Sequence, residues 1–304
     1  MKHSLKKRSR IVTKATGLSS EDGSQPKVNL FLIGAQKAGT TALHSMLSEL
    51  PEIQMSAKKE IHFFDRDQLD WNKPDYHELH SHFDWTVPDV QRGEATPITA
   101  YWPNAVSRLK RYNPQARLLF IVRHPVFRAH SHWKMAYKRG QEDQDFEFVM
   151  SEAGRARMKG QAHRVYSYVE RGFYGQALQR IFEHFPDEQV LVIKSDDFRC
   201  EPEKTLKSVS GFLDLEIPSE KQLTLKSDYI VKVDTRTLGD LDYDQRNRHE
   251  ALYIDDAQEF ERLSGLSVRE WFEPEYMETS GSFNSHDDVG NVPAMEFSVK
   301  CRNK

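Results

Sequence analysis

The chain has 304 residues, of which 43 are Lys or Arg and 46 are Asp or Glu, so its formal net charge is −3. This length suits one large domain or two small ones, and the charge balance argues against a protein that coats nucleic acid. No apolar run approaches the roughly 20 residues that a membrane-spanning helix needs. The two cysteines, Cys200 and Cys301, are far apart and favour neither a disulfide framework nor a zinc site.

Both ends of the chain are polar. Residues 1–26 are rich in Lys, Arg, Ser and Gly without a hydrophobic period, which predicts a flexible basic arm. A solvated tail is the simpler interpretation of its charges, and contact with a phosphate or an anionic surface is the alternative. No apolar stretch follows the basic start, as a secretory signal would require. Residues 273–304 contain Gly and Pro among polar residues and predict a second flexible tail.

Strand-like and helix-like segments alternate over residues 27–272, which we expect to form one domain. Short continuous apolar runs, typical of strands covered on both faces, occur at 28–33, 117–122 and 189–193. The alternation predicts an α/β domain with a P-loop-like, three-layer fold, in which helices flank a mainly parallel central sheet. The main helices are expected at 40–50, 104–112, 125–138, 174–185, 202–213 and 255–263.

The junction of the first strand and the first helix predicts an anion-binding loop. Small residues there let backbone N–H groups approach an anion, and the start of the following helix adds free donors. A lysine supplies a full positive charge, and two threonine hydroxyls can bond phosphate oxygens. An ordinary strand–helix turn is the alternative. The candidate ligands are Gln36, Lys37, Ala38, Gly39, Thr40 and Thr41.

This loop differs from the loop of nucleoside triphosphatases, which reads G-x-x-x-x-G-K-[ST]. Here Thr40 follows Gly39 directly, and Lys37 stands two residues before that glycine. We also find no convincing apolar strand that ends in an Asp able to hold magnesium. These differences argue against ATP as the ligand.

Two signatures in order resemble the sulfotransferases, enzymes that use 3′-phosphoadenosine-5′-phosphosulfate (PAPS). The loop at 36–41 resembles their 5′-phosphosulfate loop, and the segment RHPVFRAHS at 123–131 resembles their 3′-phosphate motif, R-x-P-x-x-R-x-x-S. A further segment, EIHFF at 60–64, is similar to that of the heparan-sulfate-type carbohydrate sulfotransferases. The resemblance covers about residues 28–271. It implies a PAPS-dependent enzyme that requires no metal, in a soluble form without a membrane anchor.

On the donor side, sulfuryl transfer requires charge on the leaving phosphate to be neutralised while the donor is held in line. Lys37 is the candidate for neutralising the bridging oxygen as the S–O bond breaks. The resemblance assigns the 3′-phosphate to Arg123, whose guanidinium offers a fork of donors, and to Ser131. A surface ion pair is the alternative interpretation of Arg123.

On the acceptor side, the resemblance makes Glu60 the general base. Phe63 and Phe64 follow it closely, so we expect partial desolvation to raise the pKa of this carboxyl. His62 is the alternative base, or the residue that orients Glu60. A solvated glutamate beside two lysines is the simpler interpretation of the same position.

This chain departs from the family in two places. Ala95 stands where several heparan-type enzymes carry a lysine after the glutamate, here Glu94, which remains a candidate for orienting donor or acceptor. The late donor loop has no clear match, although Lys226, Lys232 and Arg236 lie in the corresponding region.

The predicted function is transfer of a sulfuryl group from PAPS to a hydroxyl, or less favourably an amine, of a carbohydrate or small metabolite. A P-loop nucleotide kinase or phosphotransferase, and a non-catalytic nucleotide- or glycan-binding relative, are the alternatives. The small net charge favours a smaller acceptor over a polyanionic glycan such as heparan sulfate. We expect no nucleic-acid partner, no membrane span and a cytoplasmic location, and the sequence does not define the oligomeric state.

Overall fold

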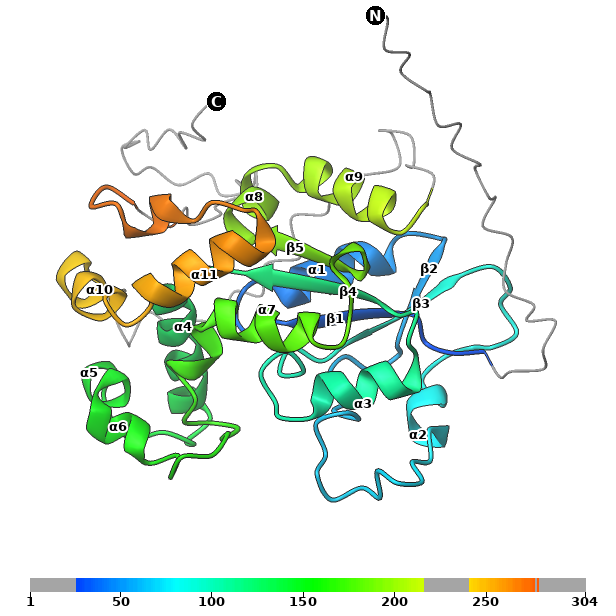
Figure 1. The fold of residues 1–304 in the computed structure, drawn as a ribbon, viewed down its shortest axis with the longest axis horizontal. Coiled ribbons are helices and arrows are strands. Elements are labelled where there is room, and N and C mark those ends of the chain that lie inside the picture. The colour runs from blue at the N-terminus through cyan, green and yellow to red at the C-terminus, as the bar shows by residue number, and fades with distance from the viewer. Residues whose placement is uncertain (1–25, 216–240, 277, 279–304) are drawn as a thin grey trace, which may run out of the picture.

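The computed structural model describes residues 26–215, 241–276 and 278. Five parallel strands form one sheet in the order β2-β3-β1-β4-β5, and helices flank it on both sides (Figure 1). The predicted α/β class with a parallel central sheet is therefore confirmed. The strands are β1 (Leu30–Gly34), β2 (Ile53–Met55), β3 (Gln91–Ala95), β4 (Arg117–Val122) and β5 (Val190–Lys194).

The predicted helices are present, with ends that differ by at most three residues from expectation. They are α1 (Thr40–Ser48), α3 (Ala105–Tyr112), α4 (Pro125–Lys138), α7 (Tyr174–Phe182), α9 (Pro202–Phe212) and α11 (Ile254–Ser264). The shorter helices were not predicted, and they are α2 (His77–His80), α5 (Phe146–Met150), α6 (Glu152–Ala156), α8 (Ser195–Cys200) and α10 (Tyr243–Glu250). The described ranges also contain the 3₁₀ turns η1 (Glu170–Gly172), η2 (Asp187–Gln189) and η6 (Arg269–Phe272).

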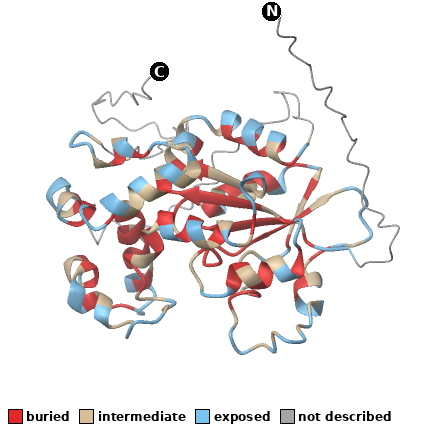
Figure 2. Cartoon of the chain, in the orientation of Figure 1, coloured by how far each residue is buried: buried red, intermediate tan, exposed pale blue. Residues whose placement is uncertain are grey.

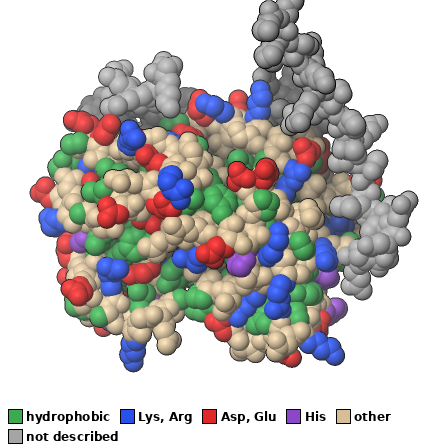
Figure 3. All heavy atoms as spheres, viewed as in Figure 1, with side chains coloured by type: hydrophobic (Ala, Val, Ile, Leu, Met, Phe, Trp, Pro, Cys, Tyr) green, Lys and Arg blue, Asp and Glu red, His purple; other side chains and the backbone are tan. Residues whose placement is uncertain are grey.

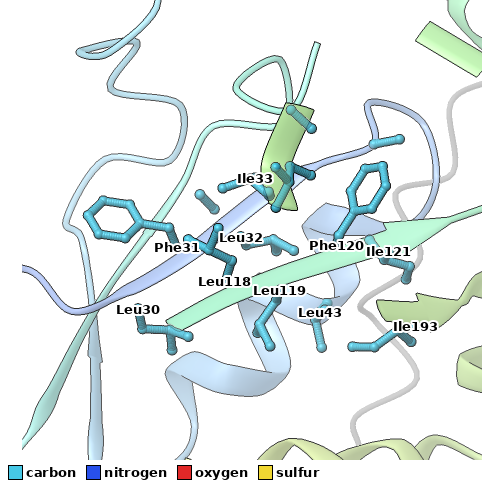
Figure 4. Close-up of a cluster of buried hydrophobic side chains, with 14 of the residues drawn as sticks. Leu30, Phe31, Leu32, Ile33, Leu43, Leu118, Leu119, Phe120, Ile121 and Ile193 are labelled. Atoms are coloured by element: carbon cyan, nitrogen blue, oxygen red, sulfur yellow. The ribbon is translucent and has the colours of Figure 1, made fainter. Parts of the chain in front are cut away.

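The main core forms around β1 and β4, whose side chains are covered on both faces. All of β1 is buried, as are five of the six residues of β4, which is why both segments read as continuous apolar runs. Leu43 from α1 and Ile193 from β5 lie beside them (Figure 4). The burial pattern places these strands at the centre and the polar helix faces outside (Figure 2).

A second, smaller core fixes α4 against α5 beside the sheet (Figure 1). Val126, Ala129 and Trp133 on one face of α4 pack in this cluster with Phe146 and Val149 of α5. Such spacing of apolar residues at three and four positions is typical of a helix with one buried face. The packing holds the start of α4, and with it the end of β4, in place.

The strand order creates a crevice at the carboxyl end of β1. β1 pairs with β3 on one side and with β4 on the other, so the loops that follow these strands diverge from this point. Ligands of open parallel sheets bind outside the carboxyl ends of the strands where the order reverses in this way. None of the helices within the described ranges is long and apolar enough to cross a membrane.

Candidate active site

The predicted anion loop lies in this crevice, between the end of β1 and the start of α1. Two of its residues adopt left-handed backbone conformations, Lys37 with φ of 71° and Gly39 with φ of 108°. Gly39 tolerates this conformation because it has no Cβ. Thr40, the first residue of α1, is buried, whereas Thr41 is exposed. The positive end of the α1 dipole therefore faces the loop.

Lys37 is a half-buried cation among other cations. Burial, followed by the positive charges of Arg123 and Arg139, lowers the pKa of its ammonium to about 8, although the Glu60 carboxylate acts in the opposite direction. No residue within the described ranges forms a hydrogen bond or ion pair with this ammonium. An anion bound in the loop would relieve the unfavourable desolvation and raise the pKa again.

Arg123 lies at the end of β4 and reaches the anion loop. Its Nη1 donates to the backbone carbonyl of Lys37 at 3.0 Å, and the backbone carbonyl of Arg123 accepts from the Tyr174 hydroxyl at 2.7 Å. Its Nε donates to the Glu278 carboxylate at 2.5 Å, and its Nη2 also bonds that group. The two sequence signatures are thus brought together in space. Glu278, expected in the polar tail, lies in contact with them.

The other residues of the second signature lie along α4. Ser131 is half-buried near the middle of this helix. Arg128 is fully buried and donates to the backbone carbonyl of Tyr168, so it supports the packing under α4. His124 is also fully buried, with its Nε2 at 3.1 Å from Glu250 and 3.0 Å from the carbonyl of Trp271.

The segment that carries Glu60 and His62 is held against the end of β3. Both residues are left-handed, with φ of 60° and 58°. The backbone N–H of Glu60 donates to the carbonyl of Ala95 at 2.9 Å, and the N–H of His62 donates to the Thr96 hydroxyl at 3.3 Å. Glu94, whose pKa burial raises to about 7, accepts from the same hydroxyl at 2.5 Å. The end of β3 therefore shapes this turn.

A chain of alternating charges runs through His62. Its Nε2 lies 3.6 Å from the Glu60 carboxylate, and its Nδ1 lies 2.9 Å from the buried Asp65 carboxylate. Arg164 bonds the same carboxylate through Nη1 at 2.6 Å. Lys59 lies 2.8 Å from Glu60. The imidazole is thus held between two carboxylates, each with a further cation behind it.

This arrangement corrects one expectation about the base. We expected desolvation to raise the pKa of Glu60, but its pKa is lowered to about 2, because hydrogen bonds from His62 and Lys59 outweigh the opposing effect of burial. The pKa of His62 is raised to about 9 by the hydrogen bond to Asp65 and then by that to Glu60. At neutral pH, Glu60 is a carboxylate and His62 an imidazolium.

The comparisons with known proteins agree with this geometry. The sequence model of the sulfotransferase family matches residues 29–219, more than half of the chain. The chain belongs to the sulfotransferase family. Mouse (Mus musculus) heparan sulfate glucosamine 3-O-sulfotransferase 3A1 is 28% identical over 200 residues, which cover 64% of this chain and 48% of the relative. Human (Homo sapiens) heparan sulfate glucosamine 3-O-sulfotransferase 5 is 28% identical over 190 residues, which cover 61% of this chain and 53% of the relative.

The chain thus spans about half the length of these curated relatives. Among solved structures, a sulfotransferase from Alicyclobacillus acidocaldarius superposes with a TM-score of 0.68 at 23% identity, covering 82% of this chain and 100% of that one. This similarity shows a shared fold, and it agrees with the predicted P-loop-like architecture.

Several residues of this sulfotransferase-family site were not predicted. Asp65 and Arg164 complete the charge chain, and the buried Arg171 donates to the Gln36 side chain in the predicted anion loop. The spacing of His62 and Asp65 was a usable signal, because both follow the glutamate in one short turn. Arg164 lies 99 residues from Asp65 and Arg171 lies 135 residues from Gln36, so no local sequence pattern indicated either contact. Lys226, Lys232 and Arg236 lie outside the described residues.

The charge chain predicts how stability depends on pH. The folded pKa of His62 is raised, so its stabilising effect is complete below about pH 6.5 and is lost as the pH rises through about 9. We expect His62→Gln to lower the free energy of unfolding by about 1 kcal/mol at pH 6, a modest value because the side chain is 39% exposed. Chemical unfolding at pH 6 and 9.5 measures this difference. An equal loss at both pH values would contradict the ion pairs.

Proposed function

We propose that this chain transfers a sulfuryl group from PAPS to a hydroxyl of a carbohydrate or small metabolite. One observation carries the proposal: the predicted 3′-phosphate ligand Arg123 and the predicted base Glu60 both lie within electrostatic reach of the Lys37 ammonium. Arg123 contacts the backbone of Lys37, and the Glu60 carboxylate acts on the pKa of Lys37. The residues proposed to bind the donor, to neutralise the leaving group and to act as the base are thus neighbours.

The donor side of the proposed reaction follows from the loop. PAPS places its 5′-phosphosulfate against the N–H groups of the loop and the start of α1, with its 3′-phosphate at Arg123 and Ser131. The sulfur–oxygen bond to the 5′-phosphate breaks as the acceptor oxygen bonds to sulfur. Negative charge grows on the bridging oxygen, and Lys37 neutralises it. The products are the sulfated acceptor and adenosine 3′,5′-bisphosphate (PAP).

The acceptor side needs a base for one proton. Glu60 exposes 38% of its side chain and is ionised, so an acceptor hydroxyl can reach it and donate its proton to it. Its ion pair with His62 makes it a weak base at rest. The proton becomes acidic only as the acceptor oxygen bonds to sulfur, so late transfer to a weak base suffices. His62 is protonated and orients Glu60, whereas Asp65 and Arg164 fix the imidazole.

A carbohydrate acceptor is supported by the surroundings of the base. The guanidinium of Arg164 lies 4.5 Å above the half-buried ring of Trp102, whose Nε1 donates to Asp67 at 2.9 Å. An aromatic ring can pack against the apolar face of a sugar, and the charged groups beside it can form hydrogen bonds with the sugar hydroxyls. Acidic and basic side chains are interspersed on the face shown in Figure 3, and the formal net charge of −3 favours a short acceptor over a long polyanion.

Calorimetry with PAP and with magnesium–ATP tests the proposal before an acceptor is known. We expect PAP to bind without magnesium and ATP to bind far more weakly, with no gain from the metal. Magnesium-dependent ATP binding would instead support a kinase. Turnover of labelled PAPS over a panel of mono- and oligosaccharides then tests catalysis, and binding without turnover on any acceptor would favour a non-catalytic relative.

A further inference from the structure

The Glu278 carboxylate lies between two guanidinium groups, and one of them belongs to Arg123, which contacts the predicted anion loop. Arg123 bonds both of its oxygens, and Arg199 at the end of α8 donates to one of them from Nη2 at 3.0 Å. Only 9% of the Glu278 side chain is exposed. A forked contact of this kind is the arrangement with which arginines bind a carboxylate or a phosphate.

The segment before Glu278 is seated on the folded domain. The ring of Tyr276 stacks on the ring of His124, with 5.2 Å between centroids, and its hydroxyl lies 3.0 Å from the Asp196 carboxylate. The buried Arg246 donates to the backbone carbonyls of Glu273, Pro274 and Tyr276. Several independent contacts therefore hold the preceding segment in place, so that the Glu278 carboxylate lies beside the two arginines.

Arg123 connects this carboxylate to the donor loop. The same guanidinium that bonds Glu278 donates through Nη1 to the Lys37 carbonyl. Arg199 also bonds Asp196 at 2.6 Å, and its buried Nε has no hydrogen-bond partner among the described residues. Arg123 and Arg199 therefore share the Glu278 carboxylate, and the Nε of Arg199 remains available to donate a further hydrogen bond.

We propose that Arg199 joins Arg123 in the site for the 3′-phosphate of the donor, and that the Glu278 carboxylate is an internal occupant that the donor must displace. This inference rests on the proposed function. It adds a ligand outside the two sequence signatures and a competitor from the chain itself.

The chemistry of the two anions favours exchange. A phosphate monoester carries a charge of about −1.5 to −2 at neutral pH and three acceptor oxygens, whereas the carboxylate carries one charge and two oxygens. Although burial raises the pKa of Glu278, Arg123 and Arg199 outweigh it and hold the pKa at about 2. Glu278 therefore does not leave by protonation at neutral pH, and a competing anion must remove it.

Calorimetry on the full chain tests the competition. The variant is Glu278→Gln, and the matched control is Glu275→Gln, which removes the same charge from an exposed position on the same segment. If the occupied state is about 90% populated or more, opening the site raises the affinity for PAP about tenfold or more. We expect that gain for Glu278→Gln, no change for Glu275→Gln, and no change in either for 5′-AMP, which lacks the 3′-phosphate.

A second variant tests Arg199. In the Glu278→Gln background, we expect Arg199→Gln to weaken PAP binding about tenfold, as loss of a charge-assisted bond does, and to leave 5′-AMP binding unchanged. Retained 5′-AMP binding also shows that the variant is folded. An unchanged or weaker PAP affinity in Glu278→Gln, while the native chain binds PAP, would overturn the inference and leave the proposed function intact. Absence of PAP binding in every variant would overturn both.

Discussion

Lys37→Met is expected to lower kcat with PAPS by about 10²–10³-fold, the effect of removing one group that stabilises charge in a transition state. The substitution keeps an unbranched side chain, one atom shorter, and the backbone carbonyl that Arg123 contacts, but it removes the ammonium. The loss falls mainly on kcat, because charge grows on the bridging oxygen only as the bond to sulfur breaks. Initial rates at saturating PAPS measure it.

Lys58→Met is the matched control, because this lysine stands two residues before Glu60 in the sequence and is exposed. We expect a change of less than about twofold, as for most surface substitutions. A second readout is the affinity for PAP against pH. Because the pKa of Lys37 is about 8 in the free protein, the affinity of the native chain for PAP is expected to fall above that pH. The affinity of Lys37→Met is expected to show no such fall. Equal kcat in Lys37→Met and the native chain would contradict the assigned role.

The central strands could be predicted from sequence because both of their faces are apolar. β1 and β4 read as continuous hydrophobic runs, and the structure buries nearly all of their side chains. β3 also lies inside the sheet, but it reads QRGEA, and no local pattern marks it as a strand. Its place depends on pairing with β1 and β2, which is a property of the tertiary structure. The strand that shapes the Glu60 turn was missed for this reason.

The site divides in the same way. Lys37 and Arg123 follow buried strands and Glu60 stands in a recognisable motif, so all three could be proposed as site residues from the sequence. Arg199 and Glu278 belong to segments far along the chain and meet Arg123 only through folding. The sign of the shift in the pKa of Glu60 was also wrong, because neighbouring apolar residues indicate desolvation but do not show where the His62 ring lies. The contact with His62 at 3.6 Å lowers the pKa of Glu60 by more than partial burial raises it.

Glu60→Gln is expected to lower kcat by about 10²–10⁴-fold, the usual contribution of a positioned base. The amide keeps the shape of the side chain but does not take up the acceptor proton. PAP affinity stays within about twofold of the native value, because Glu60 is assigned to the acceptor and not to the donor. Glu49→Gln, at an exposed position after α1, is the matched control, and we expect it to retain native turnover.

The pH dependence of kcat separates Glu60 from His62 as the base. Glu60 is ionised above about pH 2, so with Glu60 as base the rate at saturating PAPS is nearly flat between about pH 5 and 8. If His62 were the base, only its neutral form would act, and the rate would rise about tenfold per pH unit up to its pKa near 9. Such a rise, together with high activity in Glu60→Gln, would reverse the two roles. A flat profile with an inactive Glu60→Gln assigns the proton to the carboxylate, because only a group already deprotonated across this range gives both results.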